Sequence, residues 1–379
     1  MNASPPPPPG SGTHDATAPN ARAGGRKLDG AASGIAADGG TAASRPRRTP
    51  PARRLAAAVL AAAVAALAVL SLFTGYVDLS PQRLLAGTLA GETIPQRILL
   101  DIRLPRTLLC VAVGAALGIT GAAMQGLLRN PLAEPGLLGV SSGAALGAVL
   151  ALYTGFADAF YAALPLAGFA GTAAATAFVF FLAGRQTGTT TLILAGVAVS
   201  SLCGALISLV LNWSPNPTAV TEIVFWLLGS LADRSSRDVE LALPFIAAGG
   251  ALLLGCGRGL RALTLGEDTA RSLGIDLARL RRNVLAGSAL AVGAAVSVSG
   301  AIGFIGLVAP HLMRPFSGGN PARLLPLSAL AGAALLTLAD LGVRMLHEGG
   351  PELKLGVLTA LVGAPFFLTL ILRARREIA

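Results

Sequence analysis

Long apolar runs alternate with short polar segments through most of the chain. A helix needs about 20 mainly apolar residues to cross the ~30 Å hydrocarbon layer of a bilayer. A shorter run near 305–316 contains Pro310 and Pro315 and predicts a broken or tilted crossing, which brings the expected number of crossings to about ten. The other predicted membrane helices lie near 55–73, 107–127, 137–155, 160–183, 190–211, 241–257, 284–303, 324–343 and 355–372.

The pattern therefore predicts an all-α polytopic membrane protein, with an additional short re-entrant or surface helix at FWLLGSL (225–231). A faint internal repeat gives the fold an inverted-repeat character. Gly-Ala at 121–122 and at 300–301 is each followed by a proline ten residues later, and 194–205 resembles 354–365. These pairs are five crossings apart, so the two halves would have opposite topology, as in many transporters.

Residues 1–50 have a different composition, with PPPPP at 5–9 and much Gly, Ala, Ser and Thr. Such a segment has too little large apolar surface to offset the entropy lost on ordering, so we expect a disordered, low-complexity cytoplasmic tail. The membrane domain is expected over 51–379. Its first apolar run, 55–73, is longer than a signal-peptide core and is interpreted as a retained first span.

Composition agrees with a membrane protein. The chain is 53% hydrophobic and 13% charged, where a soluble domain carries about 25% charged residues. The alternation typical of a transmembrane β-barrel is not seen. The net charge of +10 does not indicate nucleic-acid binding, because the basic residues lie at the ends of apolar runs.

The distribution of Lys and Arg predicts the orientation. With the N-terminus inside, the inner segments hold 21 of these residues and the outer segments 8; without the tail the inner count is still 13. The positive-inside rule then places both termini in the cytoplasm of a multi-pass bacterial inner-membrane protein, in contact with membrane lipid.

A polar island, LTLGEDTARSLGIDLARLRR at 263–282, interrupts this apolar chain. Acidic residues open each half and basic residues close the second, which suits the charges at helix ends. Gly274 divides the stretch. We expect two short amphipathic helices at the cytoplasmic surface, resting on lipid headgroups or forming a platform for a partner. The apolar residues of one helix face recur at spacings of three and four: Ala270, Leu273, Leu277 and Leu280.

The sequence carries no energy source of its own. Its two lysines, Lys27 and Lys354, lie outside any GxxxxGK[ST] motif. The only acidic residue well inside a span is Asp340, and its spacing to Arg344 predicts a structural ion pair rather than a proton relay. Cysteines and histidines show no metal-site spacing, so no metal or cofactor is predicted. GVSSG (139–143) opens an apolar helix, which is the wrong context for a hydrolase elbow.

Several motifs together resemble the FecCD-type permease family, which serves iron-siderophores, haem and cobalamin as the membrane subunit of type II ABC importers. The resemblance covers about residues 55–375. Two departures concern subfamily: ELKLG carries Lys354 where the family often has Pro, and PFSGGNPAR follows PHLMR. The matching stretches are RLPRTLLCVAVGAALG (103–118), GAAMQGLLRNPLAEPGLLGVSSGAALG (121–147), GEDTARSLGI (266–275), GFIGLVAPHLMR (303–314), LLPLSALAGAALLTLAD (324–340) and ELKLGVLTALVGAPFFL (352–368).

The resemblance implies a transmembrane permease domain that is not itself an enzyme. It would pair with a second permease subunit, the same chain or a paralogue, and ATP would be hydrolysed by two cytoplasmic ATP-binding-cassette subunits. These would bind coupling helices between spans six and seven, at about 263–282. The family's coupling motif maps onto Gly266, Glu267, Asp268, Ala270, Arg271, Leu273 and Gly274.

A periplasmic substrate-binding protein would deliver the cargo. In the family such proteins dock on outward-facing arginines, which correspond to Arg103, Arg106 and Arg344; membrane-interface anchoring is the alternative role for these side chains. GAALG at 114–118 and 143–147 is a small-xxx-small pattern that favours close helix packing. Residues expected near the translocation path are Gln125, Asn130, Ser141 and Ser142, with plain helix packing as the alternative for the serines.

The expected cargo is a ferric chelate. A siderophore is favoured because that use is the commonest in the family, with haem or cobalamin as alternatives. Two other classes of function remain: an ion-coupled secondary carrier or channel for a small solute, and a membrane scaffold without transport. A secondary carrier would need a coupling-ion site within its spans.

Overall fold

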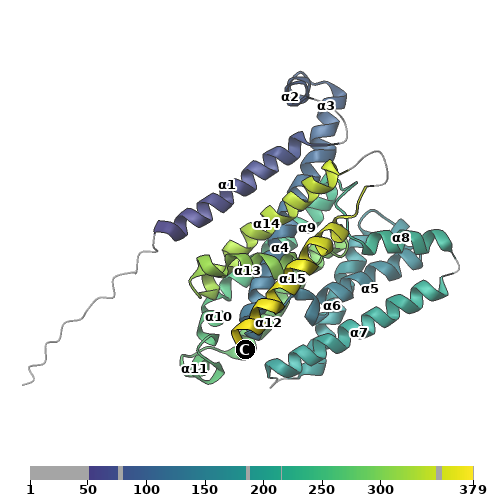
Figure 1. The fold of residues 1–379 in the computed structure, drawn as a ribbon. Helices are drawn as coiled ribbons and strands as arrows, with labels where there is room; N and C mark the ends of the chain where they lie inside the picture. Colours follow the sequence, from purple (N-terminus) through teal and green to yellow (C-terminus); the bar gives the residue numbers. More distant parts are fainter. Residues whose placement is uncertain (1–50, 76–79, 185–187, 215, 347–351, 379) are drawn as a thin grey trace, which may run out of the picture. The chain divides into compact units, whose positions relative to one another are not determined.

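The computed structural model describes residues 51–75, 80–184, 188–214, 216–346 and 352–378. In this part of the chain the protein is helical, with no strand (Figure 1). The predicted tail, residues 1–50, lies outside it. The longer helices are α1 (Pro51–Phe73), α4 (Leu104–Leu128), α5 (Val140–Tyr153), α6 (Ala163–Ala183), α7 (Thr189–Trp213), α8 (Pro217–Leu227), α9 (Ser236–Gly255), α12 (Leu277–Ser299), α13 (Ile305–Ser317), α14 (Pro321–Met345) and α15 (Leu355–Ile378).

Short helices join these elements: α2 (Pro81–Leu89), α3 (Thr93–Arg97), the π-helical turn η1 (Ile98–Arg103), η2 (Pro135–Leu138), η3 (Phe156–Asp158), α10 (Gly257–Leu263) and α11 (Glu267–Ser272). Seven stretches among the described residues are long and apolar enough to cross a membrane: α1, the continuous α3–η1–α4 stretch, α6, α7, α9, α12 and α14. The shorter apolar helices are α5, α8 and the part of α15 up to Thr369. The all-α polytopic prediction is confirmed; the count of ten crossings and the inverted repeat stay predictions.

The interior is built around α4. It packs against α9, α12, α13 and α14, and most of its apolar stretch is buried. In contrast, α1 packs on α14 and α4 and leaves nearly all of its apolar residues partly or fully exposed, as expected of a helix that faces lipid. The chain therefore has a buried central helix inside a layer of lipid-facing ones.

Small residues allow these helices to approach closely. A Cβ added to Gly114 would lie 2.4 Å from the carbonyl oxygen of Gly332, and one on Gly118 would lie 2.0 Å from that of Ser328. The second GAALG does the same between α5 and α6, where a Cβ on Gly147 would lie 2.1 Å from the Ala167 carbonyl oxygen. Both GAALG segments are thus helix-packing seams, as the small-xxx-small pattern predicts.

Helix α13 differs in part from its predicted form. It is one continuous helix with Pro310 and Pro315 inside it, so the broken form of the predicted crossing is wrong and the tilted form stays a prediction. The interruptions fall at its ends instead, where Phe304 (φ 66°) and Gly318 (φ 62°) are both left-handed. The backbone at these two residues, rather than the prolines, limits α13 to 13 residues.

Candidate functional site

Three regions of the structure hold the residues that the sequence singles out or that line a cavity: α11 with its neighbours, a cluster of arginines, and a groove along α15. Helix α12 connects the first and the third. It contacts α11 near its start (Figure 1) and ends at Ser299, and its 23 residues span about 35 Å. The polar α11 region and the end of the groove beside Ala301 therefore lie about one membrane thickness apart.

Helix α11 is set off by two glycines with positive φ. Gly266 (φ 104°) precedes it and Gly274 (φ 80°) follows it. Around Gly274 the backbone N–H of Ile275 donates to the carbonyl of Ala270 and that of Gly274 to the carbonyl of Arg271, which is a Schellman motif. Because only glycine adopts such φ values without strain, these two positions explain why a short helix stands apart here.

Charge pairs tie α11 to itself and to α12. Arg271 donates to Asp268 (2.7 Å) and to Glu267 (3.2 Å) within the helix. Glu267 also accepts from Arg281 of α12 at 2.8 Å, which is the longer-range contact. The Asp268 side chain is 99% exposed, so the in-helix pairs contribute little stability. The Glu267–Arg281 pair is the one that fixes α11 against the start of α12.

The second of the two predicted short helices is not a separate element. Residues 277–282 form the first turns of α12, and the Asp276 side chain caps that helix by accepting from the Arg279 backbone N–H at 2.9 Å. The expected apolar face is also only partly correct. Ala270, Leu277 and Leu280 are buried, whereas the Leu273 side chain is 59% exposed. Leu273 precedes the Gly274 turn, and the chain reversal there directs it outward.

The α11 region therefore presents an exposed, charged surface with apolar side chains at both edges. Leu265 lies before α11 and is 63% exposed, and Leu273 lies after it. Exposed leucines beside charged residues suit contact with a protein partner or with lipid headgroups, so both predicted alternatives stay open.

The predicted docking arginines are buried and held by partners within the chain. Arg106 donates to Asp340 at 2.7 and 2.9 Å and also pairs with Glu352. Arg344 pairs with the same Asp340, as the i,i+4 spacing predicts, and donates to the backbone carbonyls of Ser71 and Thr74 at 3.0 Å. The network joins α1, α4, α14 and the segment before α15.

Arg103 lies beside this network and donates to the carbonyl of Leu72 at 3.1 Å. None of the three arginines is more than 7% exposed. Their arrangement gives them a structural role, because each neutralises a buried carboxylate or satisfies a carbonyl at a helix end. Direct contact with a delivery protein would require them to leave these partners, so docking through them stays a prediction.

The four residues predicted near the translocation path do not come together. Gln125 is buried between α4 and α13, where its side-chain oxygen accepts from Arg314 at 2.7 Å. Asn130 is exposed after α4 and caps its own turn by accepting from the Leu132 backbone N–H at 2.9 Å. Ser141 and Ser142 are half-buried on α5. Their role in the path stays a prediction.

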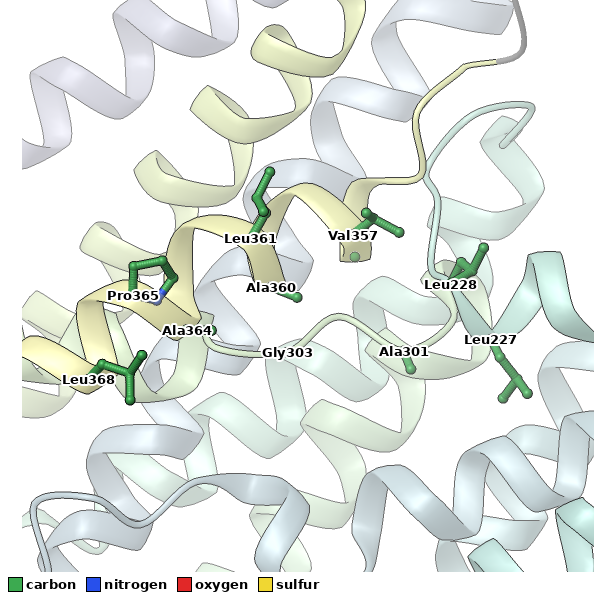
Figure 2. Close-up of a pocket in the computed structure, with 11 residues that line it drawn as sticks. Leu227, Leu228, Ala301, Gly303, Val357, Ala360, Leu361, Ala364, Pro365 and Leu368 are labelled. Atoms are coloured by element: carbon green, nitrogen blue, oxygen red, sulfur yellow. The ribbon is translucent and has the colours of Figure 1, made fainter. Parts of the chain in front are cut away.

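An apolar groove of about 700 Å³, which the sequence reasoning missed, runs along α15. Figure 2 shows α15 on one side of it, and Ala301, Gly303 and the end of α8 on the other. The side chains that line it are almost entirely aliphatic, for example Val357, Leu361 and Leu368. Such a surface offers few hydrogen-bond partners to anything that lies in the groove.

Three backbone segments meet without intervening side chains at the inner wall of this groove. A Cβ on Gly229 would lie 2.4 Å from the Ala301 carbonyl oxygen, one on Gly300 2.2 Å from that of Trp226, and one on Gly356 2.3 Å from that of Leu228. Backbone hydrogen bonds link the same segments, from Ser230 N–H to Ser299 (2.7 Å) and from Gly356 N–H to Gly229 (3.3 Å). We call this contact the glycine junction.

Among the described residues, no three His, Cys, Asp or Glu side chains gather in an arrangement that could hold a metal ion.

Comparison with known proteins identifies the family. The family model described as the FecCD transport family matches residues 63–373. This chain belongs to the FecCD transport family. Its relatives include an uncharacterised ABC transporter permease, YvrB of Bacillus subtilis, which is 45% identical over 74% of this chain and 80% of that protein.

Two further FecCD relatives carry substrate names. The cobalamin import permease BtuC of Halobacterium salinarum is 43% identical over 73% of each chain, and the hemin transport permease HmuU of Yersinia pestis is 42% identical over 74% of this chain and 84% of its own length. A solved structure of a metal-chelate type ABC transporter in an inward-facing conformation matches with a TM-score of 0.76 and 33% identity, over 84% of this chain and 99% of that one. The protein is therefore a permease subunit of an ABC transporter.

Proposed function

We propose that this permease imports a ferric chelate from the periplasm to the cytoplasm across the bacterial inner membrane, with a siderophore as the favoured cargo. The relatives named for cobalamin and hemin and the metal-chelate transporter support a large chelate as cargo. Haem and cobalamin remain the alternatives within this class. The excess of Lys and Arg in the inner segments supports cytoplasmic termini.

The observation that carries the proposal is the exposed α11 surface, held to α12 by Glu267 and Arg281. Two ATP-binding-cassette subunits would dock there, with Leu265 and Leu273 as the apolar contacts. Since α12 runs from this surface to the glycine junction, a displacement of α11 would be delivered to the groove at its other end. The proposal thus explains why an apolar chain keeps a charged, protruding helix.

The groove along α15 would form one half of the path, and a second permease subunit, the same chain or a paralogue, would supply the other half. An aliphatic wall offers cargo few hydrogen-bond partners, and a periplasmic binding protein would deliver the cargo to it. The binding protein would dock on the side of the permease that carries the arginine network. Arg83 and Arg97, in α2 and α3, are exposed close in sequence to that network and would offer cations without breaking its ion pairs.

Uptake of radiolabelled ferric siderophores, haemin and cobalamin tests the proposal. The chain would be expressed in a deletion strain together with its ATPase and binding-protein partners. We expect uptake of one chelate that vanadate abolishes. Uptake that is insensitive to vanadate but is abolished by an ionophore would favour the secondary carrier instead. Uptake of none of the chelates would contradict the proposed cargo class.

The α11 surface has its own test. Leu273→Asp places a charge among the proposed apolar contacts, so we expect it to abolish uptake and ATPase association while the protein still accumulates in the membrane. Leu273→Met keeps the apolar contact and serves as the matched control. If the Asp variant still binds the ATPase and transports at the normal rate, α11 is not the docking surface.

A further inference from the structure

A second, polar pocket of about 220 Å³ lies among α8, the loop that follows it, the end of α12 and the residue before α15. It is lined by neighbours of the residues that line the apolar groove, in the same three segments that meet at the glycine junction. The pocket therefore lies at the C-terminal end of α12, where the groove also lies, and far from α11. Nothing in the proposed function uses it.

Two buried N–H groups of this pocket have no hydrogen-bond acceptor within the described part of the chain. They are the indole Nε1 of Trp226 and the guanidinium Nε of Arg234. The Trp226 side chain is only 9% exposed, so its N–H is shielded from bulk solvent. A buried donor without an acceptor is costly, and both of these donors belong to residues that line one cavity. An acceptor-rich group that enters the cavity would relieve that cost if the side chains turn toward it.

The cationic and the acidic residues that line the pocket differ in their exposure to solvent. Lys354 is half-buried, with its Nζ 5.4 Å from the centre of the Phe225 ring, and Arg234 is half-buried as well. The two carboxylates of the lining, Glu222 and Asp233, are both exposed. The two cationic residues are therefore less exposed than the two acidic ones, whose charges water screens more strongly.

The pocket is held in shape by backbone rather than by flexible side chains. The loop after α8 contains two residues with positive φ, Gly229 (70°) and Asp233 (57°), and is bonded to the end of α12 through Ser230 and Ser299. The Ser230 hydroxyl also accepts from the Ala232 N–H at 3.1 Å. A cavity with fixed walls does not need to be ordered when a ligand enters it.

We propose that this pocket binds a carboxylate group of the cargo, through Lys354, Arg234 and the Trp226 N–H, while the apolar body of the cargo lies in the adjoining groove. An ionised carboxylate supplies the acceptor oxygens that the buried donors lack and the charge that the two cations complement. The inference rests on the proposed transport function only for its statement that the carboxylate belongs to cargo. Lys354 would thus be a specificity-determining residue at a position where the family often has Pro.

Fluorescence of Trp226 reports binding directly. The full chain has two tryptophans, and Trp213 is 73% exposed, so Trp213→Phe leaves Trp226 as the single reporter. This variant would be placed in lipid nanodiscs and titrated with citrate, and with triethyl citrate as the uncharged analogue. We expect a saturable change with citrate, none with triethyl citrate, and none with sodium chloride at equal ionic strength.

Charge variants in the same background test the assignment. Lys354→Gln removes a charged partner and should weaken citrate binding about tenfold, the effect of one charged hydrogen bond. Glu222→Gln removes a rim carboxylate and should tighten it. Arg237→Gln is the matched control, because Arg237 lies over the Tyr161 ring outside the pocket lining and should leave binding unchanged.

Three results would overturn the inference: no saturable change with citrate, an equal response to triethyl citrate, or equal effects of the Lys354 and Arg237 substitutions. The assay needs neither ATPase nor binding protein. Citrate binding without chelate uptake would therefore contradict the proposed function alone, and chelate uptake without citrate binding would contradict this inference alone.

Discussion

Asp340 shows how a charged residue is tolerated inside the protein. Its side chain is fully buried and receives both Arg106 and Arg344. A buried carboxylate is costly unless it is paired and hydrogen-bonded, and here both oxygens accept from guanidinium groups. Glu352 adds a second carboxylate against Arg106, so the buried positive charge is also offset.

Replacing Asp340 with Asn should destabilise the protein strongly. The substitution leaves two buried arginines without their shared counter-charge, and breaking such a buried group typically costs about 3–5 kcal/mol. Thermal unfolding of the purified protein in detergent would measure the loss. Asp268→Asn, at a fully exposed carboxylate, is the control and should leave the melting temperature unchanged. An Asp340→Asn variant as stable as the parent would mean that the network does not hold α4 to α14.

At this scale the sequence predicts only local partners. The i,i+4 spacing predicts the Asp340–Arg344 pair, and the structure confirms it. The pairing with Arg106 joins residues 234 positions apart, and Arg106 with Glu352 joins residues 246 apart, which no spacing rule reaches. The same limit explains why the sequence could not predict that Arg106 has two carboxylate partners within the chain.

Glycines determine which helices pack closely against α4, because a residue without a side chain lets two backbones come into contact. Along α4, Gly114 and Gly118 face the backbone of α14, and Gly121 faces that of α13, where an added Cβ would lie 1.8 Å from the Gly306 carbonyl oxygen. In a membrane, where lipid is as apolar as the helices, such close backbone contact replaces the hydrophobic effect as the source of association.

Gly118→Ala should therefore destabilise the protein, although alanine is the better helix former. Its methyl would lie 2.0 Å from the Ser328 carbonyl oxygen, so α4 and α14 must separate, with an overpacking cost of about 1–3 kcal/mol. Gly250→Ala is the matched control inside α9, where nothing lies within 4 Å of the added methyl. That change should be neutral or stabilising by up to about 1 kcal/mol. Melting temperatures in detergent would compare the two, and a stabilised Gly118→Ala would contradict the packing argument.

Helix positions were largely predictable because apolar length and glycine spacing are local signals. The helix ends that the sequence predicts wrongly are determined by backbone conformation or by contacts with residues outside the local pattern. The second surface helix merges into α12 because Asp276 caps a helix that simply continues, and α13 ends where Phe304 and Gly318 adopt positive φ rather than at its prolines. No periodicity of side chains reports either feature.

The orientation of the whole molecule can be tested with single cysteines. The three native cysteines, Cys110, Cys203 and Cys256, are all buried, so they should not react with a membrane-impermeant maleimide. Asp268→Cys, on α11, should be labelled only in inverted vesicles, because the excess of inner Lys and Arg predicts a cytoplasmic α11.

Glu92→Cys, in the exposed turn before α3, should be labelled only from the periplasmic side of spheroplasts. The parent protein with its native cysteines is the blank for both experiments. Labelling of the two cysteines from the same side, or from the opposite sides to those expected, would overturn the proposed orientation.

The groove of Figure 2 shows what the sequence could not supply at the scale of the molecule. Its walls come from the end of α8, the segment after α12, and α15, which are remote in sequence and individually ordinary apolar stretches. The sequence predicts polar residues along the path, and their role there stays a prediction. The aliphatic residues of the groove give no comparable signal, because each belongs to an apolar stretch like many others in the chain. Two of the predicted polar residues have contacts that no spacing rule reports: Gln125 accepts from Arg314, and Asn130 caps its own turn.

The glycine junction turns α12 into a rod clamped at both ends. One end is pinned to α11 by the Glu267–Arg281 pair, and the other is seated backbone-to-backbone against α8 and the start of α15. A helix about 35 Å long that is held at both ends transmits a displacement along its axis from one end to the other. A force applied at the α11 surface would then act through α12 on the glycine junction, where the groove and the polar pocket meet.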